Sequence, residues 1–150
     1  MSALDIRTGR DVMDSTVEDV VHRGVLVCAR DAPLSFVAEL MATHRVHCVV
    51  VSDDPEHAGS LWGVVSDLDL VAAATVRALD EQTAGASAAT EALRVSPAET
   101  LRRAGQLMTE HGAAHLVVVD PQSLRPVGVV STLDIAAALS EPDGVLRDNP

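Results

Sequence analysis

Two serine–aspartate pairs stand at matching places in the chain and carry side chains suited to binding a small polar ligand. The octapeptide GVVSDLDL recurs as GVVSTLDI, so Ser66 and Asp69 correspond to Ser131 and Asp134. In each copy a short apolar run leads directly into an expected helix, and the polar pair occupies its first turn. Serine followed by an acidic residue three positions later is also typical of a helix cap, in which each side chain accepts the other's backbone N–H. For an isolated motif, capping is the more frequent role.

The same pair can bind a nucleoside phosphate. Free N–H groups and the positive dipole end at a helix start favour an anion, and a serine hydroxyl adds a hydrogen bond. An aspartate repels phosphate, but it accepts hydrogen bonds from the two hydroxyls of a ribose. Gly63 and Gly128 precede the serines by three residues, and glycine in a strand often marks the close approach of another group. A ribonucleotide with its phosphate at serine and its ribose at aspartate fits this pattern.

The octapeptides belong to a longer internal repeat, which sets the expected fold. Matching residues are 67 positions apart up to residue 53 and 65 apart from residue 63 onward. Apolar periodicity and turn residues predict strand, helix, strand, strand and helix in each half. The expected elements of the first half are 25–28, 34–44, 47–51, 61–65 and 66–79; those of the second half are 93–95, 96–111, 115–119, 127–130 and 131–139. The fold class is therefore α+β, built from two β-α-β-β-α repeats.

The expected domain organisation follows the repeat. We expect an N-terminal arm at 1–10, a first repeat at 11–80, a linker at 81–88, a second repeat at 89–140 and a flexible tail at 141–150. The whole chain has the length of one domain, so the two halves are expected to share a core.

Composition argues against several classes of function. The net charge is −11, and all 11 cationic residues counted as Lys or Arg are arginines, which disfavours binding to nucleic acid and to anionic membranes. One Trp, one Phe and no Tyr leave little aromatic surface on which single-stranded bases could stack. No apolar run is long enough to span a bilayer, and the N-terminus lacks the pattern of a signal peptide. The expected location is the cytoplasm.

The sequence offers no sign of catalysis or of a metal cofactor. No nucleophile stands at an informative spacing from a base, and no glycine-rich phosphate loop is present. His44 and His111 end equivalent helices, where an imidazole meets the negative end of the dipole, and no set of histidines has metal-ligand spacing. Cys28 and Cys48 lie in apolar strand runs and are expected to be buried thiols, although a disulfide between them remains open.

The repeat resembles a tandem pair of CBS domains, the module named after cystathionine β-synthase, here as a stand-alone Bateman module. The likeness rests on Leu-x-x-Ala-x-x-Leu-Met in the helix of the second repeat, an apolar strand that ends in Asp, and then Gly-Val-Val-Ser-x-x-Asp. It extends over about residues 10–140. The resemblance implies two repeats that pack through their sheets with pseudo-twofold symmetry, and two clefts between the repeats that bind AMP, ADP, ATP or S-adenosylmethionine.

The resemblance also implies roles for particular residues. Ser66 and Ser131 would contact phosphate or ribose, and Asp69 and Asp134 would hold the ribose hydroxyls. Adenine would lie against the short first strand of each repeat, which gives these candidates: Val27, Cys28, Ala29, Arg94, Val95 and Ser96. Cations that could neutralise phosphate are Arg45, His47, Arg102, Arg103, His115 and Arg125, of which Arg45 and His115 are retained as site residues.

Three departures from the family pattern bear on these sites. Val50 and Val117 stand where many members have proline in the second strand, and serine replaces the common threonine at the motif hydroxyl. Asp67 adds a second carboxylate to the first motif, whereas the second motif has the neutral Thr132. The second motif is therefore expected to be the better site for an anion.

Taken together, the sequence predicts a regulatory module that binds an adenosine derivative and acts on a separate, unidentified effector protein. The alternative is a ligand-independent dimerising scaffold, in which the Ser-x-x-Asp pairs only cap helices. Both interpretations imply a homodimer, and neither requires an enzymatic activity.

Overall fold

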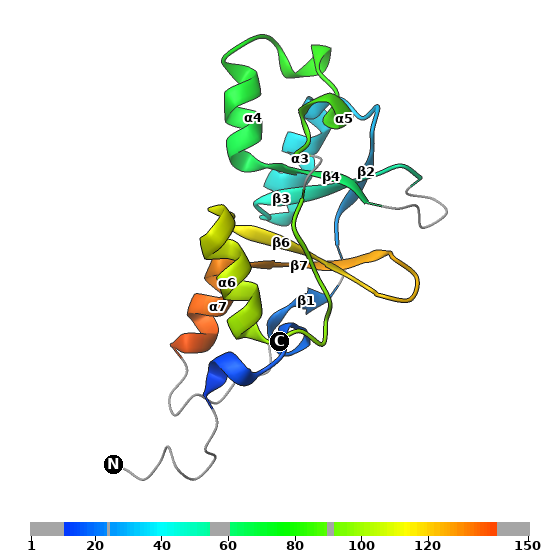
Figure 1. Cartoon of the computed structure of the whole chain (residues 1–150). Helices are drawn as coiled ribbons and strands as arrows, with labels where there is room; N and C mark the ends of the chain where they lie inside the picture. The colour runs from blue at the N-terminus through cyan, green and yellow to red at the C-terminus, as the bar shows by residue number, and fades with distance from the viewer. Residues whose placement is uncertain (1–10, 24, 55–60, 90–91, 141–150) are drawn as a thin grey trace. The chain divides into compact units, whose positions relative to one another are not determined.

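The computed structural model describes residues 11–23, 25–54, 61–89 and 92–140 (Figure 1). The chain divides into two compact units. We call Gly24–Ala92 with Pro121–Pro126 the repeat-1 unit. The remainder, Met1–Arg23, Leu93–Asp120 and Val127–Pro150, is the repeat-2 unit.

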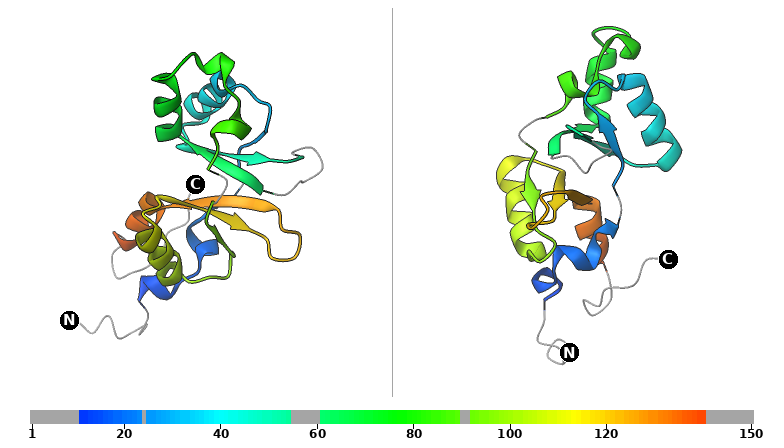
Figure 2. Two further views of the ribbon diagram at one scale, coloured as in Figure 1. Left: turned by 45° about the horizontal axis from the view of Figure 1, so that its top comes forward. Right: turned by 90° about the vertical axis from the view of Figure 1, so that its right-hand side faces the viewer.

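The repeat-1 unit is built on a three-stranded sheet of order β2-β3-β4. Its elements in chain order are β2 (Val27–Ala29), α3 (Leu34–His44), β3 (Cys48–Ser52), β4 (Leu61–Ser66), α4 (Asp67–Ala74), the 3-10 turn η3 (Leu79–Glu81) and α5 (Ala84–Ser87). Strand β2 runs parallel to β3, and β3 pairs antiparallel with β4. Helices α3 and α4 contact each other and the sheet, while α5 contacts β2 and β4 (Figure 2).

Valine-rich strands give this unit its core. All five residues of β3 are buried, as expected for a central strand, whereas β4 alternates between buried and half-buried residues. Leu34, Val37 and Met41 of α3 lie three or four positions apart, so they form one helix face that packs on the sheet.

The repeat-2 unit has a four-stranded sheet of order β1-β7-β6-β5. The second half of the chain contributes β5 (Arg94–Val95), α6 (Leu101–His111), β6 (His115–Val119), β7 (Pro126–Ser131) and α7 (Thr132–Leu139). The N-terminal part contributes η1 (Val12–Asp14), α2 (Val17–Val20) and β1 (His22–Arg23). Leu101, Leu116 and Val130 are fully buried in its core.

Each unit is completed by the segment that precedes the other repeat in sequence. In the repeat-2 unit, Val17 N–H donates to Glu99 O at 2.7 Å, and Leu101 N–H donates to Ser15 O at 2.8 Å. In the repeat-1 unit, Ala84 N–H donates to Ala32 O at 2.8 Å in the same way. The short segments before the two repeats are therefore exchanged, a feature that the linear repeat pattern does not reveal.

The sequence-based predictions of fold class and of most elements are confirmed. Helix α3 (Leu34–His44) and strand β6 have the expected bounds, and α6 ends at His111 as expected. Helix α6 was expected to begin at residue 96, but it begins at Leu101, because the Thr100 hydroxyl accepts the Arg103 N–H at 3.1 Å and caps the helix there. Helix α4 was expected to reach residue 79, but it ends at Ala74. There, the Thr75 hydroxyl donates to Ala72 O at 2.7 Å, and Gln82 Nε2 donates to Ala73 O at 3.0 Å, so side chains satisfy carbonyls at the helix end.

Two further differences concern the core and the linker. One shared core was expected from the chain length, but the buried residues form two separate clusters, one in each unit. Residues 81–88 were expected to be a connector, and they contain helix α5, whose Ala84 is fully buried in the repeat-1 core. The expected arm at 1–10 and tail at 141–150 lie outside the described residues.

Candidate functional site

The first serine–aspartate pair caps helix α4. The Asp69 carboxylate accepts the Ser66 backbone N–H at 2.8 Å, and the Ser66 hydroxyl oxygen accepts the Asp69 backbone N–H at 3.1 Å. Ser66 belongs to β4 and Asp69 to the first turn of α4, so the cap fixes the junction between strand and helix. Both residues are half-buried and remain in reach of solvent.

The second pair repeats this geometry at helix α7. Ser131 N–H donates to Asp134 Oδ2 at 2.8 Å, and Asp134 N–H donates to Ser131 Oγ at 3.1 Å. The capping role weighed from the sequence is thus confirmed at both junctions. In each cap the serine oxygen acts as an acceptor, which leaves its hydroxyl hydrogen able to donate to a ligand.

The glycine that precedes the first pair has a structural explanation. A Cβ atom added to Gly63 would lie 2.6 Å from the backbone oxygen of Ala89, and Val64 exchanges backbone hydrogen bonds with Ala89. The predicted close approach at Gly63 is therefore confirmed, but the approaching group is the chain's own backbone. This glycine does not by itself indicate a ligand.

The two junctions differ in charge. At the first, His47 Nδ1 lies 2.9 Å from Asp67 Oδ2, and Asp67 N–H donates to His47 O at 2.9 Å. At the second, Thr132 N–H donates to Ala114 O at 3.0 Å, so the equivalent pair carries no charge. The additional carboxylate anticipated at the first motif is thus paired with an imidazole from the residue before β3.

The structure brings some of the other predicted site residues to these junctions. Arg45 lies at the end of α3 in the left-handed conformation, two residues before His47, so it belongs to the edge of the sheet that carries Ser66. His115 is the first residue of β6 and follows Ala114, beside the second junction.

The predicted adenine-contacting residues are more scattered. Val27 is half-buried and pairs with Val50 in mid-sheet, and Val95 is buried in the core of the repeat-2 unit. Ala29 lies beside Ser52, at the end of the sheet away from Ser66. Arg102, one of the candidate cations, has its guanidinium 3.4 and 3.3 Å from Asp11 and Asp14, respectively.

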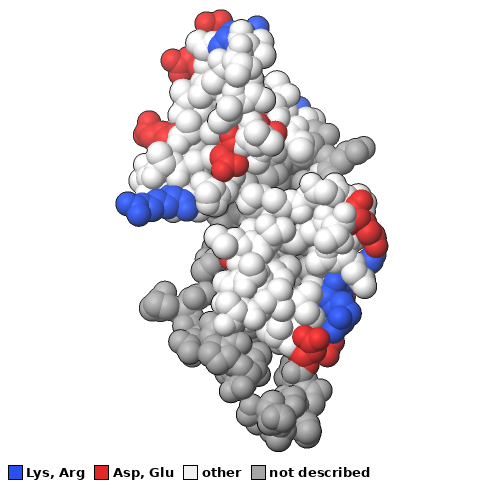
Figure 3. Space-filling model, turned by 90° about the vertical axis from the view of Figure 1, so that its left-hand side faces the viewer, with Lys and Arg blue, Asp and Glu red and all other residues white. Residues whose placement is uncertain are grey.

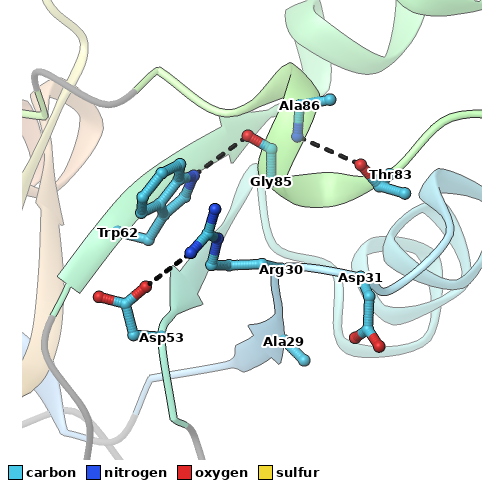
Figure 4. Close-up of a pocket in the computed structure, with 8 residues that line it drawn as sticks. All are labelled: Ala29, Arg30, Asp31, Asp53, Trp62, Thr83, Gly85 and Ala86. Atoms are coloured by element: carbon cyan, nitrogen blue, oxygen red, sulfur yellow. Dashed lines mark hydrogen bonds and ion pairs between the residues drawn. The ribbon is translucent and has the colours of Figure 1, made fainter.

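Ala29 instead lines a hollow of about 690 Å³ in the repeat-1 unit (Figure 4). The lining residues are Ala29, Arg30, Asp31, Asp53, Trp62, Thr83, Gly85 and Ala86. The Arg30 guanidinium lies over the Trp62 ring, 3.6 Å from the ring centroid, and Arg30 Nη1 is 3.4 Å from Asp53 Oδ1. Sequence reasoning missed this group. One signal was available, because Pro97 and Val127 replace Arg30 and Trp62 in the second repeat.

Both cysteines are buried and present as free thiols, as one of the two sequence-based interpretations predicted. Burial raises the pKa of Cys28 to about 11, and burial together with the nearby Asp67 charge raises the pKa of Cys48 to about 11. A thiolate is the reactive form of cysteine, so neither side chain has the character of a nucleophile.

Among the described residues, no group of three or more His, Cys, Asp or Glu side chains could hold a metal ion. In the same part of the chain, no helix is long and apolar enough to cross a membrane. Every side-chain polar atom buried within the described ranges has a hydrogen-bond partner.

The geometry of the repeat agrees with comparisons to known proteins. The family model of the CBS domain matches twice, at residues 17–75 and 88–141. The chain belongs to the CBS domain family. A CBS domain-containing protein of Bacillus subtilis (strain 168), YhcV, is 30% identical to this CBS protein over 123 residues, which are 81% of this chain and 84% of the relative.

Solved structures of CBS domain pairs share the fold. The CBS domain pair of protein MJ0100, in complex with 5′-methylthioadenosine and S-adenosyl-L-methionine, has a TM-score of 0.76 at 17% identity, over 84% of this chain and 100% of the other. CBSX2 in complex with AMP has a TM-score of 0.68 at 24% identity, over 83% of this chain and 95% of the other. CBS domain proteins are generally regulatory modules rather than catalysts.

Proposed function

We propose that this protein is a regulatory module that binds an adenosine derivative (AMP, ADP, ATP or S-adenosylmethionine) at its strand-to-helix junctions. One observation carries the proposal: both repeats present a serine hydroxyl and an aspartate carboxylate, half-buried and in the same geometry, at the start of a helix. MJ0100 binds 5′-methylthioadenosine and S-adenosyl-L-methionine, and CBSX2 binds AMP. The chemistry follows from hydroxyl donation to a phosphate or ribose and from carboxylate acceptance of ribose hydroxyls.

In this proposal the roles fall on the residues at each junction. Ser131 and Asp134 form the better anion site, because Thr132 adds no negative charge beside them. Ser66 and Asp69 form a second site in which Asp67 favours a ligand with less negative charge. Arg45 supplies positive charge at the first junction, and His115 is the candidate phosphate partner at the second. Val27 is the candidate wall for the adenine ring, since Ala29 lies at the other end of the sheet and Val95 is buried in the core.

Binding is best tested by isothermal titration calorimetry with AMP, ATP and S-adenosylmethionine. The Asp134→Ala variant should lose affinity at the second site about tenfold or more, since hydrogen bonds to a charged group contribute about 1.5–3 kcal/mol. Calorimetry is preferred to a melting temperature, because removing Asp134 also removes the helix cap and lowers stability by about 1 kcal/mol.

The chain offers a matched control for the loss of a cap. Asp19 Oδ2 accepts the Thr16 N–H at 2.9 Å at the start of helix α2, as Asp134 accepts the Ser131 N–H, and Asp19 lies outside the duplicated octapeptides. Asp19→Ala should therefore lower the melting temperature comparably and leave the affinity for adenosine compounds unchanged. If Asp134→Ala and Asp69→Ala together leave that affinity unchanged, the assignment of ribose contacts is wrong.

The caps themselves favour one alternative, a dimerising scaffold without a ligand. In each pair the serine and the aspartate side chains already accept each other's backbone N–H. Exposed apolar side chains also occur on α4 (Leu68, 73%; Val71, 63%) and on α7 (Leu133, 68%; Leu139, 55%). On the face that Figure 3 draws, broad areas of the described residues carry no Lys, Arg, Asp or Glu side chain. In both versions we propose a homodimer formed through these helix faces, in the cytoplasm, which acts on a separate effector protein.

The oligomeric state tests the proposed dimer and the scaffold alternative. Sedimentation should report a dimer for the wild-type chain and a monomer for the Leu68→Glu and Leu133→Glu double variant, because each substitution buries a charge in an apolar interface. A monomeric wild-type chain would remove the scaffold alternative. A dimer that binds no adenosine compound would leave it as the function.

A further inference from the structure

The repeat-1 unit contains a second polar constellation, remote from the serine–aspartate junction. Trp62 is the second residue of β4 and Ser66 is the last, so about 13 Å of strand separates them at about 3.3 Å per residue. The hollow around Trp62 lies at the opposite end of this strand from the α4 cap. A ligand there would be held by different residues from those of the proposed adenosine site.

Backbone contacts hold the constellation in a fixed arrangement. Trp62 Nε1 donates to Gly85 O at 3.1 Å, and Gly85 N–H donates to Arg30 O at 2.7 Å. A Cβ atom on Gly85 would lie 2.9 Å from Arg30 O, so only glycine permits this approach without displacement. In Figure 4, Arg30 extends from the end of β2 toward Trp62 and Gly85, with Asp53 on one side and Thr83 and Ala86 on the other.

The fold itself does not require these side chains. At the equivalent positions of the second repeat, Pro97 replaces Arg30, Val127 replaces Trp62, Ala98 replaces Asp31, and Glu18 replaces Gly85. The unit that carries those replacements has the same strand and helix order. Arg30, Trp62 and Gly85 therefore form a feature specific to the repeat-1 unit, and it includes the only tryptophan of the chain.

The guanidinium offers a flat surface and free donors. One of its faces lies on the Trp62 ring, and its Nη1 atom is paired with Asp53, yet the Arg30 side chain is 51% exposed. Asp53 is the only described residue with which the Arg30 side chain makes a polar contact, so Nε and Nη2 keep donors for a ligand. Arginine planes stack on nucleobases and other flat heteroaromatic rings.

Charge narrows the class of ligand. One guanidinium and the carboxylates of Asp31 and Asp53 line the hollow, which makes its sum of formal charges negative. A phosphate would meet net repulsion there, whereas ring N–H and amino groups could donate to Asp31, whose carboxylate makes no hydrogen bond or ion pair with another described residue. A ring carbonyl would accept from the free Arg30 donors.

We propose that this hollow binds an uncharged, planar heteroaromatic ring that carries both a carbonyl and an amino group, as guanine does. The ring stacks on the open face of Arg30, its carbonyl accepts from Arg30, and its N–H groups donate to the rim carboxylates. The site is additional to the proposed adenosine sites and uses different residues.

The test uses guanosine as the probe and calorimetry of the full-length chain with both Asp69→Ala and Asp134→Ala, which disables the proposed adenosine sites. Guanosine should bind this background, and adenosine, which lacks the carbonyl, should bind more weakly. Guanosine 5′-monophosphate should also bind more weakly than guanosine because of the two carboxylates. Adding Arg30→Lys, which keeps the positive charge and removes the planar guanidinium group, should lower the affinity for guanosine about tenfold or more.

Arg102→Lys is the matched control, since Arg102 is 50% exposed and also pairs with aspartates, but lies in the repeat-2 unit. It should leave the guanosine affinity unchanged. Absence of guanosine binding, equal affinity in Arg30→Lys, or tighter binding of the monophosphate would each overturn the proposal. The proposed adenosine function is judged separately, by AMP binding to the chain with Asp69 and Asp134 intact, which Arg30→Lys should not change.

Discussion

The side chains of His47 and Asp67 lie within hydrogen-bond distance across the first strand-to-helix junction, with Nδ1 and Oδ2 2.9 Å apart. Their counterparts at the second junction, Ala114 and Thr132, have no ionisable side chains. Both members of the pair are more than half exposed, so its contribution to stability is small, about 0–1 kcal/mol. Its importance lies in the local charge beside Ser66.

Replacing Asp67 by threonine should make the first junction resemble the second. In an Asp134→Ala background, which isolates the first site, we expect Asp67→Thr to raise the affinity for AMP by about two- to fivefold, the range given by an exposed charge interaction of up to 1 kcal/mol. The gain should be larger for ATP, which carries more negative charge. His47→Ala should act in the opposite direction. Calorimetry at low salt, where screening is weakest, measures the gain in Asp67→Thr and the loss in His47→Ala. Equal AMP affinities in these two variants and in the Asp134→Ala background would contradict the prediction.

The left-handed residue that ends α3 should be a point of strain. Arg45 has φ 54°, whereas Gly112 ends the equivalent helix α6 with φ 62°. Non-glycine residues adopt this conformation at a cost of roughly 1–2 kcal/mol, so Arg45→Gly should raise the free energy of unfolding by about 0.5–1 kcal/mol after the loss of chain entropy. Urea denaturation measures the change. Gly112→Ala should lower stability, and a destabilised Arg45→Gly chain would show that the arginine side chain makes an offsetting contact.

Gly63 should tolerate no larger residue. Its added Cβ atom would meet Ala89 O at 2.6 Å, a backbone atom that cannot move without breaking the pairing of Val64 with Ala89. We expect Gly63→Ala to destabilise the chain by about 1–3 kcal/mol, as overpacking does. Gly105, inside α6, has only the flexible end of Met13 at 3.5 Å. Gly105→Ala should therefore stabilise by about 0.5–1 kcal/mol, the helix-propensity difference. Thermal unfolding of the two variants should shift in opposite directions.

The buried thiols should make stability fall in alkaline solution. The pKa of each cysteine is about 11 in the folded chain, against 9.0 for an ordinary thiol. Between these values the unfolded chain releases the thiol protons while the folded chain retains them, so the free energy of unfolding decreases as pH rises. The slope should approach about 1.4 kcal/mol per pH unit for each thiol. The Cys28→Ala and Cys48→Ala double variant should show a shallower dependence in denaturation series from pH 8 to 11, and an unchanged slope would contradict the prediction.

The elements that could be predicted from sequence are those whose ends have local causes. Gly112 ends α6 in the left-handed conformation, so the end of that helix is encoded by an adjacent residue and was predicted. The start of α6 was placed five residues too early, because Ser96 and Thr100 are both suitable cap residues, and it is the Thr100 hydroxyl that accepts the Arg103 N–H. The end of α4 depends instead on Gln82, which reaches back to Ala73 from eight residues beyond the helix, and no local pattern contains that contact.

The candidate sites divide in the same way. Ser66 and Asp69 cap one another within four residues, and the duplicated pattern was sufficient to find them. Arg30 meets Trp62 only because β2, β3 and β4 align in one sheet, with an irregular register between Val51 and Ser52. Comparing the two repeats draws attention to the residues that they share. Arg30 and Trp62 occur only in the first repeat, so they stand out only when the positions at which the repeats differ are compared as well.

The exchange of the segments that precede the two repeats has consequences for the design of chimeric proteins and for the evolution of the repeats. Residues 12–23 stand next to the first repeat in the gene but complete the sheet of the second through β1 and β7. A chimera that joins a first repeat from one relative to a second from another, cut at the sequence boundary, would give each half a foreign edge or cap. Recombination between relatives would therefore succeed more often if these short leading segments moved with the half they cover, and the two repeats should have diverged as interlocked partners rather than as interchangeable parts.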